Sequence, residues 1–274
     1  MMYKHKYQNI LRFILLWFFS LLILAPVLLV VLGSFKTRGD AAHFTLTLPK
    51  TWYIDSYVHV VNSSPFFRSF ANSIFLTTIS TFAVLGLSAP AAFVIARRDS
   101  KGMKIIFSIF MLGIIAPISV IPTVVLIRTF NLYGSYWSGI FLYTARFIPW
   151  CLFLVTGFVK TIPQELDEAA ILDGTTPGKL FWLIIMPLLR SILLTSIIFI
   201  AMTIWNDFQI PVYFFSSSEK WTMPLLVFNF FGRYMRQWNY VFACLILTAL
   251  PVTVLYLFMQ KYIISGMTQG AVKG

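Results

Sequence analysis

Six apolar runs of bilayer length constrain the fold of this chain more than any other feature of its sequence. About 20 apolar residues are enough to cross a hydrocarbon core of roughly 30 Å as a helix. Four of the six runs contain no charged residue. The runs cover residues 13–32, 70–96, 105–127, 137–159, 192–213 and 240–259. They predict an all-α polytopic membrane protein with six transmembrane helices, in a single transmembrane domain over residues 1–274.

Composition and charge exclude other classes of protein. Of the 274 residues, 59% are hydrophobic and 11% are charged, whereas a soluble domain has roughly 45–50% and 25%. The net charge of +12 comes from basic residues in the segments outside the apolar runs, where they set membrane topology. We therefore expect membrane lipid as a partner and no nucleic acid.

The distribution of Lys and Arg predicts the orientation. In the short connection 97–104, four of the eight residues are basic, and cytoplasmic connections carry the excess of positive charge. This places both termini in the cytoplasm. The same orientation puts the connection 160–191 inside and the connection 214–239 outside.

The sequence shows no residues grouped for metal binding or catalysis. Both cysteines, Cys151 and Cys244, fall inside predicted spans, and the three histidines lie near no cluster of carboxylates. Thiolate and imidazole ligands need such grouping. We expect no metal site, no catalytic residue and no cofactor bound by this chain.

The connection 160–191 is the most polar stretch and carries helix signals. Thr161 and Gln164 have capping-box spacing, and three carboxylates follow near the positive end of the expected helix. Gly174 can close that helix, and Pro177 suits the first turn of a second one. The pattern predicts a helix, a tight turn and a second helix running through residues 181 and 184. It leaves open whether this unit docks on another protein or is a solvated loop.

Two charged residues stand inside predicted spans. Arg146 and Asp207 lie at similar depths from the outer ends of the fourth and fifth runs. Ionisable groups at such depths face an interior cavity or each other. We predict an ion pair or a water-bridged link between them. Alternatively, Arg146 faces the pathway and holds an acidic group, while Asp207 caps a kink at Pro211 or bonds a partner subunit.

The outer connection 214–239 is unusually apolar. Trp221, Pro224 and the run 225–231 are hydrophobic for an exposed segment. Such a patch indicates either a surface for a partner or a re-entrant segment packed on the chain's own helices.

Several motifs resemble those of a known family. The cytoplasmic connection matches the loop motif of ATP-binding cassette importer permeases, with Met186 in place of leucine, at Glu168, Ala169, Ala170, Gly174, Ile184 and Pro187. The stretch 205–208 with Pro211, the stretch 221–224 and the tail 260–274 are similar to the maltose-type carbohydrate permeases. The resemblance is to the smaller six-span subunit of that pair, and it covers nearly the whole chain.

The resemblance implies a type I importer permease fold and a role for each group of residues. The coupling residues would dock on a cytoplasmic ATPase: Glu168, Ala169, Ala170, Asp173, Gly174, Ile184 and Pro187. The polar residues of the pathway or of the helix contacts would be Arg146, Asn206 and Asp207. The residues reaching toward a binding protein would be Trp221, Thr222 and Pro224, and the tail would approach the ATPase.

The resemblance also implies the partners. They are a second homologous permease subunit, a dimer of cytoplasmic ATPase subunits and an extracellular or periplasmic sugar-binding protein. This chain has no glycine-rich phosphate loop, so ATP and Mg would be held by the ATPase. The implied function is the permease half of an ATP-driven, binding-protein-dependent importer of a sugar or oligosaccharide in a prokaryotic inner membrane.

Other transport functions stay open at this point. Related polar solutes are glycerol phosphate, a polyol or a uronic oligosaccharide. A secondary transporter would bind ions at intramembrane carboxylates, for which only Asp207 is present in the predicted spans.

Overall fold

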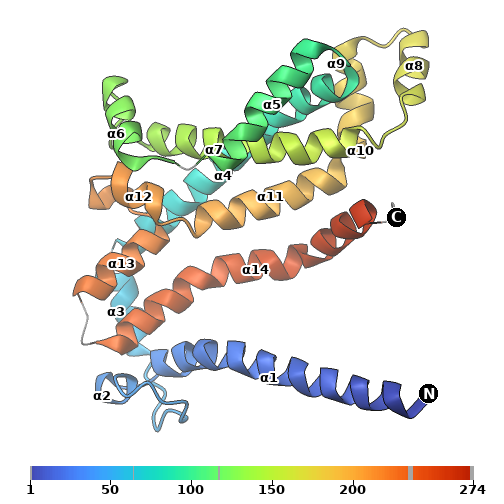
Figure 1. Ribbon diagram of the computed structural model, residues 1–274. Coiled ribbons are helices and arrows are strands. Elements are labelled where there is room, and N and C mark those ends of the chain that lie inside the picture. Colours follow the sequence, from blue (N-terminus) through green and yellow to red (C-terminus); the bar gives the residue numbers. More distant parts are fainter. Residues whose placement is uncertain (1, 64, 117, 234–236, 272–274) are drawn as a thin grey trace. The chain divides into compact units, whose positions relative to one another are not determined.

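The computed structural model describes residues 2–63, 65–116, 118–233 and 237–271, and its regular elements there are helices (Figure 1). The chain groups into two compact units, which we describe separately. The first comprises Met1–Phe67 with Leu226–Pro251, and the second comprises Arg68–Leu225 with Val252–Gly274. That the chain forms one transmembrane domain stays a prediction.

The first unit is held together by close contacts that its helices make with one another. Asn239 donates from Nδ2 to Oγ of Ser56 over 3.0 Å, and both residues are buried. A Cβ at Gly33 would lie 2.5 Å from the Phe242 ring, so only glycine admits this approach. The unit contains α1 (Met2–Ser34), α2 (Arg38–Ala41), α3 (Asp55–Ser63), most of α13 (Met223–Arg233) and the first part of α14 (Trp238–Ala271).

The second unit is built around α7, which packs against α5 and α11. Its larger helices are α4 (Phe66–Arg97), α5 (Lys101–Ile115), α6 (Val120–Thr129), α7 (Tyr136–Val159) and α11 (Arg190–Trp205). Its shorter elements are α8 (Glu165–Leu172), α9 (Pro177–Lys179), a π-helical segment (Leu180–Ile185), α10 (Met186–Leu188), α12 (Gln209–Phe214) and a 3-10 turn (Ser218–Lys220).

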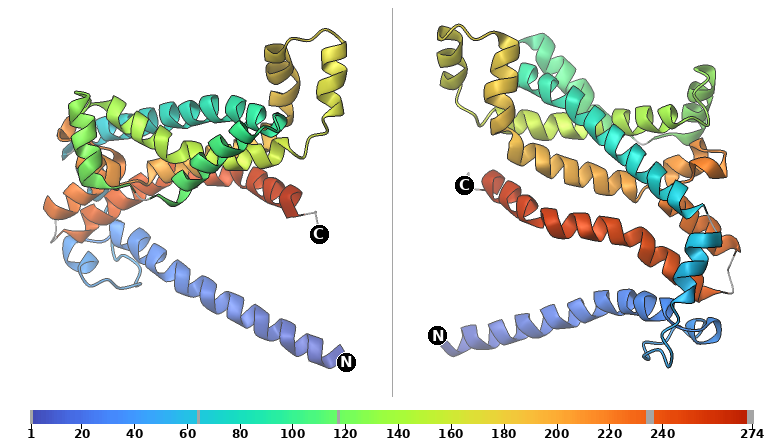
Figure 2. Two further views of the ribbon diagram at one scale, coloured as in Figure 1. Left: turned by 45° about the horizontal axis from the view of Figure 1, so that its top comes forward. Right: turned by 180° about the vertical axis from the view of Figure 1, so that it is seen from behind.

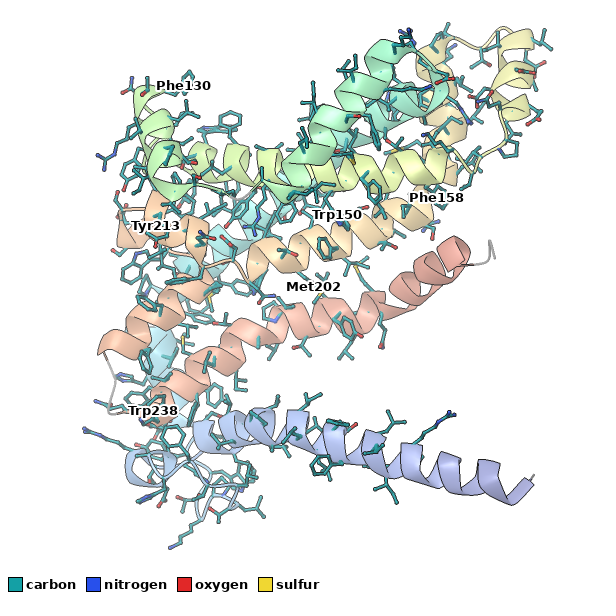
Figure 3. All side chains as sticks on the ribbon, viewed as in Figure 1. Phe130, Trp150, Phe158, Met202, Tyr213 and Trp238 are labelled. Atoms are coloured by element: carbon teal, nitrogen blue, oxygen red, sulfur yellow. The ribbon has the colours of Figure 1, made fainter. Side chains whose placement is uncertain are left out.

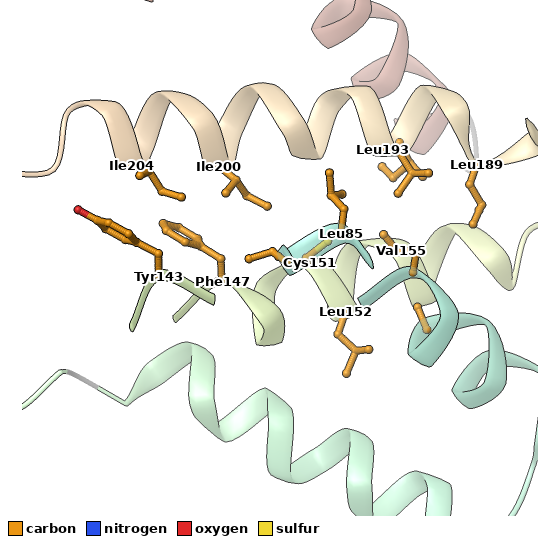
Figure 4. Packing of buried hydrophobic residues seen from close by; sticks show 14 of the residues in the cluster. Leu85, Tyr143, Phe147, Cys151, Leu152, Val155, Leu189, Leu193, Ile200 and Ile204 are labelled. Atoms are coloured by element: carbon orange, nitrogen blue, oxygen red, sulfur yellow. The ribbon is translucent and has the colours of Figure 1, made fainter. Parts of the chain in front are cut away.

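Residues at four-residue intervals along α7 form the centre of this unit. Tyr143, Phe147 and Cys151 are buried and lie on one face of the helix. Figure 4 shows Tyr143 and Phe147 facing Ile204 and Ile200 of α11. The periodic apolar face of α7 thus fixes how α11 lies beside it.

Four of the six predicted runs are confirmed as helices that are long and apolar enough to cross a membrane. These helices are Arg12–Ser34, Phe66–Arg97, Tyr136–Val159 and Trp238–Gln260. They contain the predicted runs 13–32, 70–96, 137–159 and 240–259.

The third run is two helices rather than the single helix expected. α5 and α6 meet at a bend of 118°. Ala116 has φ −67° and ψ 120°, the extended conformation that a residue adopts before a proline. Pro117 itself lies outside the described residues. α5 thus ends at Ile115, two residues before that proline in the sequence.

The fifth run is also broken. α11 ends at Trp205 and α12 begins at Gln209. α11 is also bent by 74° from the preceding stretch Pro177–Leu188. With each bent pair taken as one span, the described chain has up to six candidate spans, and four without them.

Candidate functional site

The predicted helix, turn and helix of the connection 160–191 are present. α8 stands apart from the long helices of its unit and is joined to them by non-helical connections (Figure 2). Glu168 and Ala169 are exposed on it, whereas Ala170 is buried. The motif residues of α8 therefore divide between a packed face and an open face.

The predicted capping box is wrong. The hydroxyl of Thr161 donates to the carbonyl of Phe158 over 2.7 Å, which satisfies the end of α7 instead of the start of α8. α8 begins at Glu165, and its N-cap, Gln164, makes no capping bond with its side chain. The three carboxylates of the first turn still lie at the positive end of the helix.

Gly174 closes α8 as predicted. Its φ is +77°, a conformation that glycine adopts without strain. Its N–H donates to the carbonyl of Ile171 over 2.9 Å. The N–H of Thr175 donates to the carbonyl of Ala170 over 3.0 Å. These two bonds form a Schellman motif, which ends the helix and reverses the chain.

The remaining motif residues lie on either side of this turn. Asp173 is exposed at the C-cap of α8. Pro177 opens the second helical stretch, which continues through the π-helical segment to α10. Ile184 is half-buried there and Pro187 is exposed.

A buried ion pair joins α8 to the ends of two long helices. Arg97, the last residue of α4, contacts Asp167 through two bonds, Nε to Oδ2 at 2.6 Å and Nη2 to Oδ1 at 3.2 Å. Its Nη1 donates to the carbonyls of Ile162 at 3.1 Å and Val159 at 3.4 Å. The Arg97 and Asp167 side chains are 11% and 13% exposed. The guanidinium at the end of α4 therefore contacts both the end of α7 and the first turn of α8.

Sequence reasoning missed this pair because it treated Arg97 only as a topological charge. The two partners are 70 residues apart, so no local spacing reveals the contact. The available signal was the position of a basic residue at the end of an apolar span, where the guanidinium must find acceptors.

The predicted link between Arg146 and Asp207 is present, and it includes a third residue. Nη1 of Arg146 lies 3.5 Å from Oδ1 of Asp207. Oδ2 of Asp207 accepts shorter bonds from the Tyr143 hydroxyl at 3.0 Å and the Ile210 N–H at 2.9 Å. Asp207 is therefore held mainly by Tyr143 and by the start of α12, and Arg146 is a looser partner.

The predicted pathway residues line two adjoining hollows of the second unit. Arg146 lines one of about 750 Å³ with Trp150, whose ring stacks on Phe199 at 4.2 Å. Trp150 lies between α7 and α11 in Figure 3. Asn206 and Asp207 line the other, of about 610 Å³, which Phe199 also borders. The hollows thus combine a guanidinium, amides and an aromatic surface.

The predicted outer contact segment is packed onto α4. Asn72 donates from Nδ2 to the carbonyl of Trp221 over 3.0 Å, and Ser73 accepts from the N–H of Met223 over 2.8 Å. Thr222 is 5% exposed, and Trp221 and Pro224 are half-buried. This packing agrees with the alternative of a segment folded against the chain's own helices.

The tail is described only in part. α14 continues to Ala271. The end of the tail, Val272 to Gly274, lies outside the described residues, so its expected approach to an ATPase is not tested.

The ion pair of α8 yields a first prediction. Arg97→Met leaves the buried Asp167 carboxylate unpaired, which costs about 3–5 kcal/mol. We expect amide hydrogen exchange in α8 to accelerate at least about tenfold. Arg98→Met, which alters an exposed neighbour, is the control. The double variant Arg97→Met/Asp167→Leu should exchange more slowly than Arg97→Met alone. Equal exchange in Arg97→Met and Arg98→Met would contradict the assigned role.

The Asp207 cluster yields a second prediction. Tyr143→Phe removes a 3.0 Å donor to a carboxylate that is 11% exposed, a loss worth about 1–3 kcal/mol. Arg146→Met removes the longer 3.5 Å contact and a cation–π contact with Phe147 from a side chain that is 36% exposed, so it should lower the unfolding temperature less. Thermal unfolding in detergent measures both, with Tyr213→Phe as the control for an exposed tyrosine. The reverse order would mean that Arg146 is the principal partner.

Comparisons with known proteins agree with this architecture. Residues 1–269 match the family described as binding-protein-dependent transport system inner membrane component. The multiple sugar-binding transport system permease protein MsmG of Streptococcus mutans is 34% identical, over 98% of this chain and 99% of its own length. The probable starch degradation products transport system permease protein AmyC of Thermoanaerobacterium thermosulfurigenes is 32% identical, over 93% of each chain.

A solved structure shares the fold. It is a bacterial ABC transporter involved in the import of the acidic polysaccharide alginate, and one of its chains superimposes with a TM-score of 0.82. The sequence identity is 22%, and the alignment covers 94% of this chain and 96% of the other. By this family match and these relatives, the chain belongs to the binding-protein-dependent transport system inner membrane components and is a multi-pass ABC permease subunit of the bacterial inner membrane, not itself an enzyme.

Proposed function

We propose that this chain forms half of the translocation pathway of an ATP-driven importer for a sugar or oligosaccharide. The observation that carries the proposal is the match to MsmG and AmyC along nearly the whole chain, since both names describe transport of sugars or starch products. The other half of the pathway is a second, homologous permease subunit. In this proposal the bent pair α5–α6 counts as the third of six spans and the run 192–213 as the fifth, and both termini are cytoplasmic.

The coupling site of the proposal is the exposed face of α8. Glu168 stands there among Leu166, Ile171 and Leu172, which are 44%, 60% and 88% exposed. Exposed apolar side chains rimmed by charged groups, here Glu165, Glu168 and Asp173, are typical of a protein contact. We assign it to a dimer of cytoplasmic ATPase subunits, which hold ATP and Mg. Ala169, Asp173, Gly174, Ile184 and Pro187 shape or flank this surface, and Ala170 packs α8 onto its own unit.

The pathway site of the proposal is the pair of hollows beside α7 and α11. Arg146, Asn206 and Asp207 supply its polar groups, and Phe199 supplies an aromatic face. Sugars need such a mixture, since their hydroxyl groups bind polar atoms and their C–H faces pack on aromatic rings.

The outer site of the proposal is the segment with Trp221, Thr222 and Pro224. Its backbone is fixed on α4 by Asn72 and Ser73, so it offers an ordered surface to a periplasmic or extracellular sugar-binding protein. The exposed side chains beside it are Arg68 and Glu219, at 58% and 65%.

The alternatives differ in their support. Arg146, which lines a hollow, favours the anionic alternatives, glycerol phosphate and a uronic oligosaccharide, and gives no such support to a neutral polyol. A secondary transporter is not retained, because the chain belongs to a binding-protein-dependent family.

A third prediction tests the coupling site. Glu168→Lys reverses the exposed charge of α8, and Gly174→Val places a β-branched residue at φ +77°. Each should reduce ATP-driven uptake in proteoliposomes at least about tenfold, with normal membrane insertion. Lys179→Glu reverses an exposed charge outside the α8 surface and is the control. Full uptake by both α8 variants would refute the coupling assignment.

A fourth prediction tests the cargo class. A thermal-shift screen of the partner binding protein compares neutral oligosaccharides, uronic oligosaccharides, polyols and glycerol phosphate. We expect stabilisation by a neutral or uronic oligosaccharide, because ligand binding to the folded state raises the unfolding temperature. Stabilisation by glycerol phosphate or a polyol alone would replace the sugar proposal and leave the coupling assignment intact.

A further inference from the structure

A small hollow opens where α4 ends, α5 begins and α7 ends. Its volume is about 290 Å³. Three basic residues from these separate elements converge on it, namely Arg98 after α4, Lys104 in α5 and Lys160 after α7. Met103 and Phe107 provide an apolar floor. The transport function described above uses none of these residues.

The hollow carries an excess of positive charge. Its one carboxylate, Asp99, lies with Oδ1 2.6 Å from Nζ of Lys104. The hydrogen bond from Lys104, with the charges of Lys104 and Lys160, lowers the pKa of Asp99, so this group stays ionised. Both side chains of the pair are mostly exposed, and water screens such contacts. Lys104 can therefore exchange Asp99 for an anion that binds it more tightly. Arg98 and Lys160 line the same hollow and can bind that anion too.

The backbone of α5 adds to the positive electrostatic potential of the hollow. α5 begins at Lys101, has 15 residues and has no acidic residue in its first turn. Its N-terminus thus brings the positive end of the helix dipole to the hollow, where Ser100 caps one N–H and Asp99 is the neighbouring carboxylate. Nζ of Lys160 lies 5.9 Å from the centre of the Phe107 ring, which keeps that ammonium over the apolar floor.

An apolar stripe leads away from the hollow along α5. No residue of α5 is buried. Ile106, Phe110 and Ile114, at spacing i, i+4 and i+8, are 42%, 37% and 44% exposed and continue the helix face that carries Met103 and Phe107. A basic hollow at the end of an apolar helix face has the two chemical parts of a phospholipid, a charged headgroup and acyl chains.

We propose that this hollow binds the phosphodiester headgroup of an anionic phospholipid, whose acyl chains lie along the exposed face of α5. Basic pockets between spans on the cytoplasmic side take such headgroups. The hollow lies at the ends of two candidate spans, α4 and α7, which are their cytoplasmic ends in the orientation proposed above. The alternative explanation for these basic residues is that they only set the membrane topology, which requires positive charge in the connection but no particular position for it. Lys101 supplies such charge in the same connection without lining the hollow, and so it separates the two explanations.

The test measures lipid binding by the purified transporter complex with native mass spectrometry. The probes are phosphatidylglycerol and phosphatidylcholine with identical acyl chains. One phosphatidylglycerol should bind more tightly than phosphatidylcholine. Lys104→Gln and Lys160→Gln should each raise its Kd roughly fivefold, from about 1 kcal/mol for each basic residue. Lys101→Gln should leave the Kd unchanged.

A further variant should change the affinity in the opposite direction from the lysine variants. Asp99→Asn removes the competing carboxylate, so it should lower the Kd for phosphatidylglycerol. Thermal unfolding of each variant identifies loss of folding, and Asp99→Asn keeps the proposal testable if a lysine variant misfolds. Equal affinity for the two lipids, or an equal effect of Lys101→Gln, would overturn the proposal. So would displacement of the lipid by equimolar inorganic phosphate, which would make free phosphate the ligand.

Discussion

The structure depends on the requirement that backbone polar groups inside a bilayer find partners within the protein. Continuous helices meet most of this requirement by themselves, and α4, α7 and the first part of α14 run over the full length of a span. Each contains one proline, whose missing N–H removes one bond of the helix. Where a helix stops at membrane depth, side chains must take over. At the break after α11, Asn206 donates to the carbonyl of Met202 over 2.8 Å, and Asp207 accepts from the N–H of Ile210.

This requirement explains why the polar residues of the fifth run are found at its break. Asp207 is costly to bury, yet there it closes the start of α12 and anchors Tyr143 of α7. The same carboxylate therefore serves helix capping and helix packing. Its looser contact with Arg146 leaves that guanidinium at the edge of a hollow. The predicted link to Asp207 is thus present, and an acidic group held by Arg146 stays a prediction.

Arg97 applies the same principle at the end of a span. Its guanidinium satisfies carbonyls at and after the end of α7 and pairs with Asp167. Because the pair is bidentate, it fixes the direction of the first turn of α8 as well as its position. A displacement of α8 would therefore act on α4 and α7 together. The open face of α8 stays free to contact a partner, since Asp167 and Ala170 take up its packed face.

Much of this protein was predictable from its sequence. Local apolar runs determine which segments can span a membrane, and local turn chemistry determines the close of α8 at Gly174, because both depend on residues near one another in the chain. The break of the third run has a local cause in the residue before Pro117. The contacts at the break of the fifth run, where Tyr143 binds Asp207, and the Arg97–Asp167 pair were decided only by the tertiary structure. They join residues as far as 70 positions apart, and a buried charge selects its partner from whatever the packing of helices brings within reach.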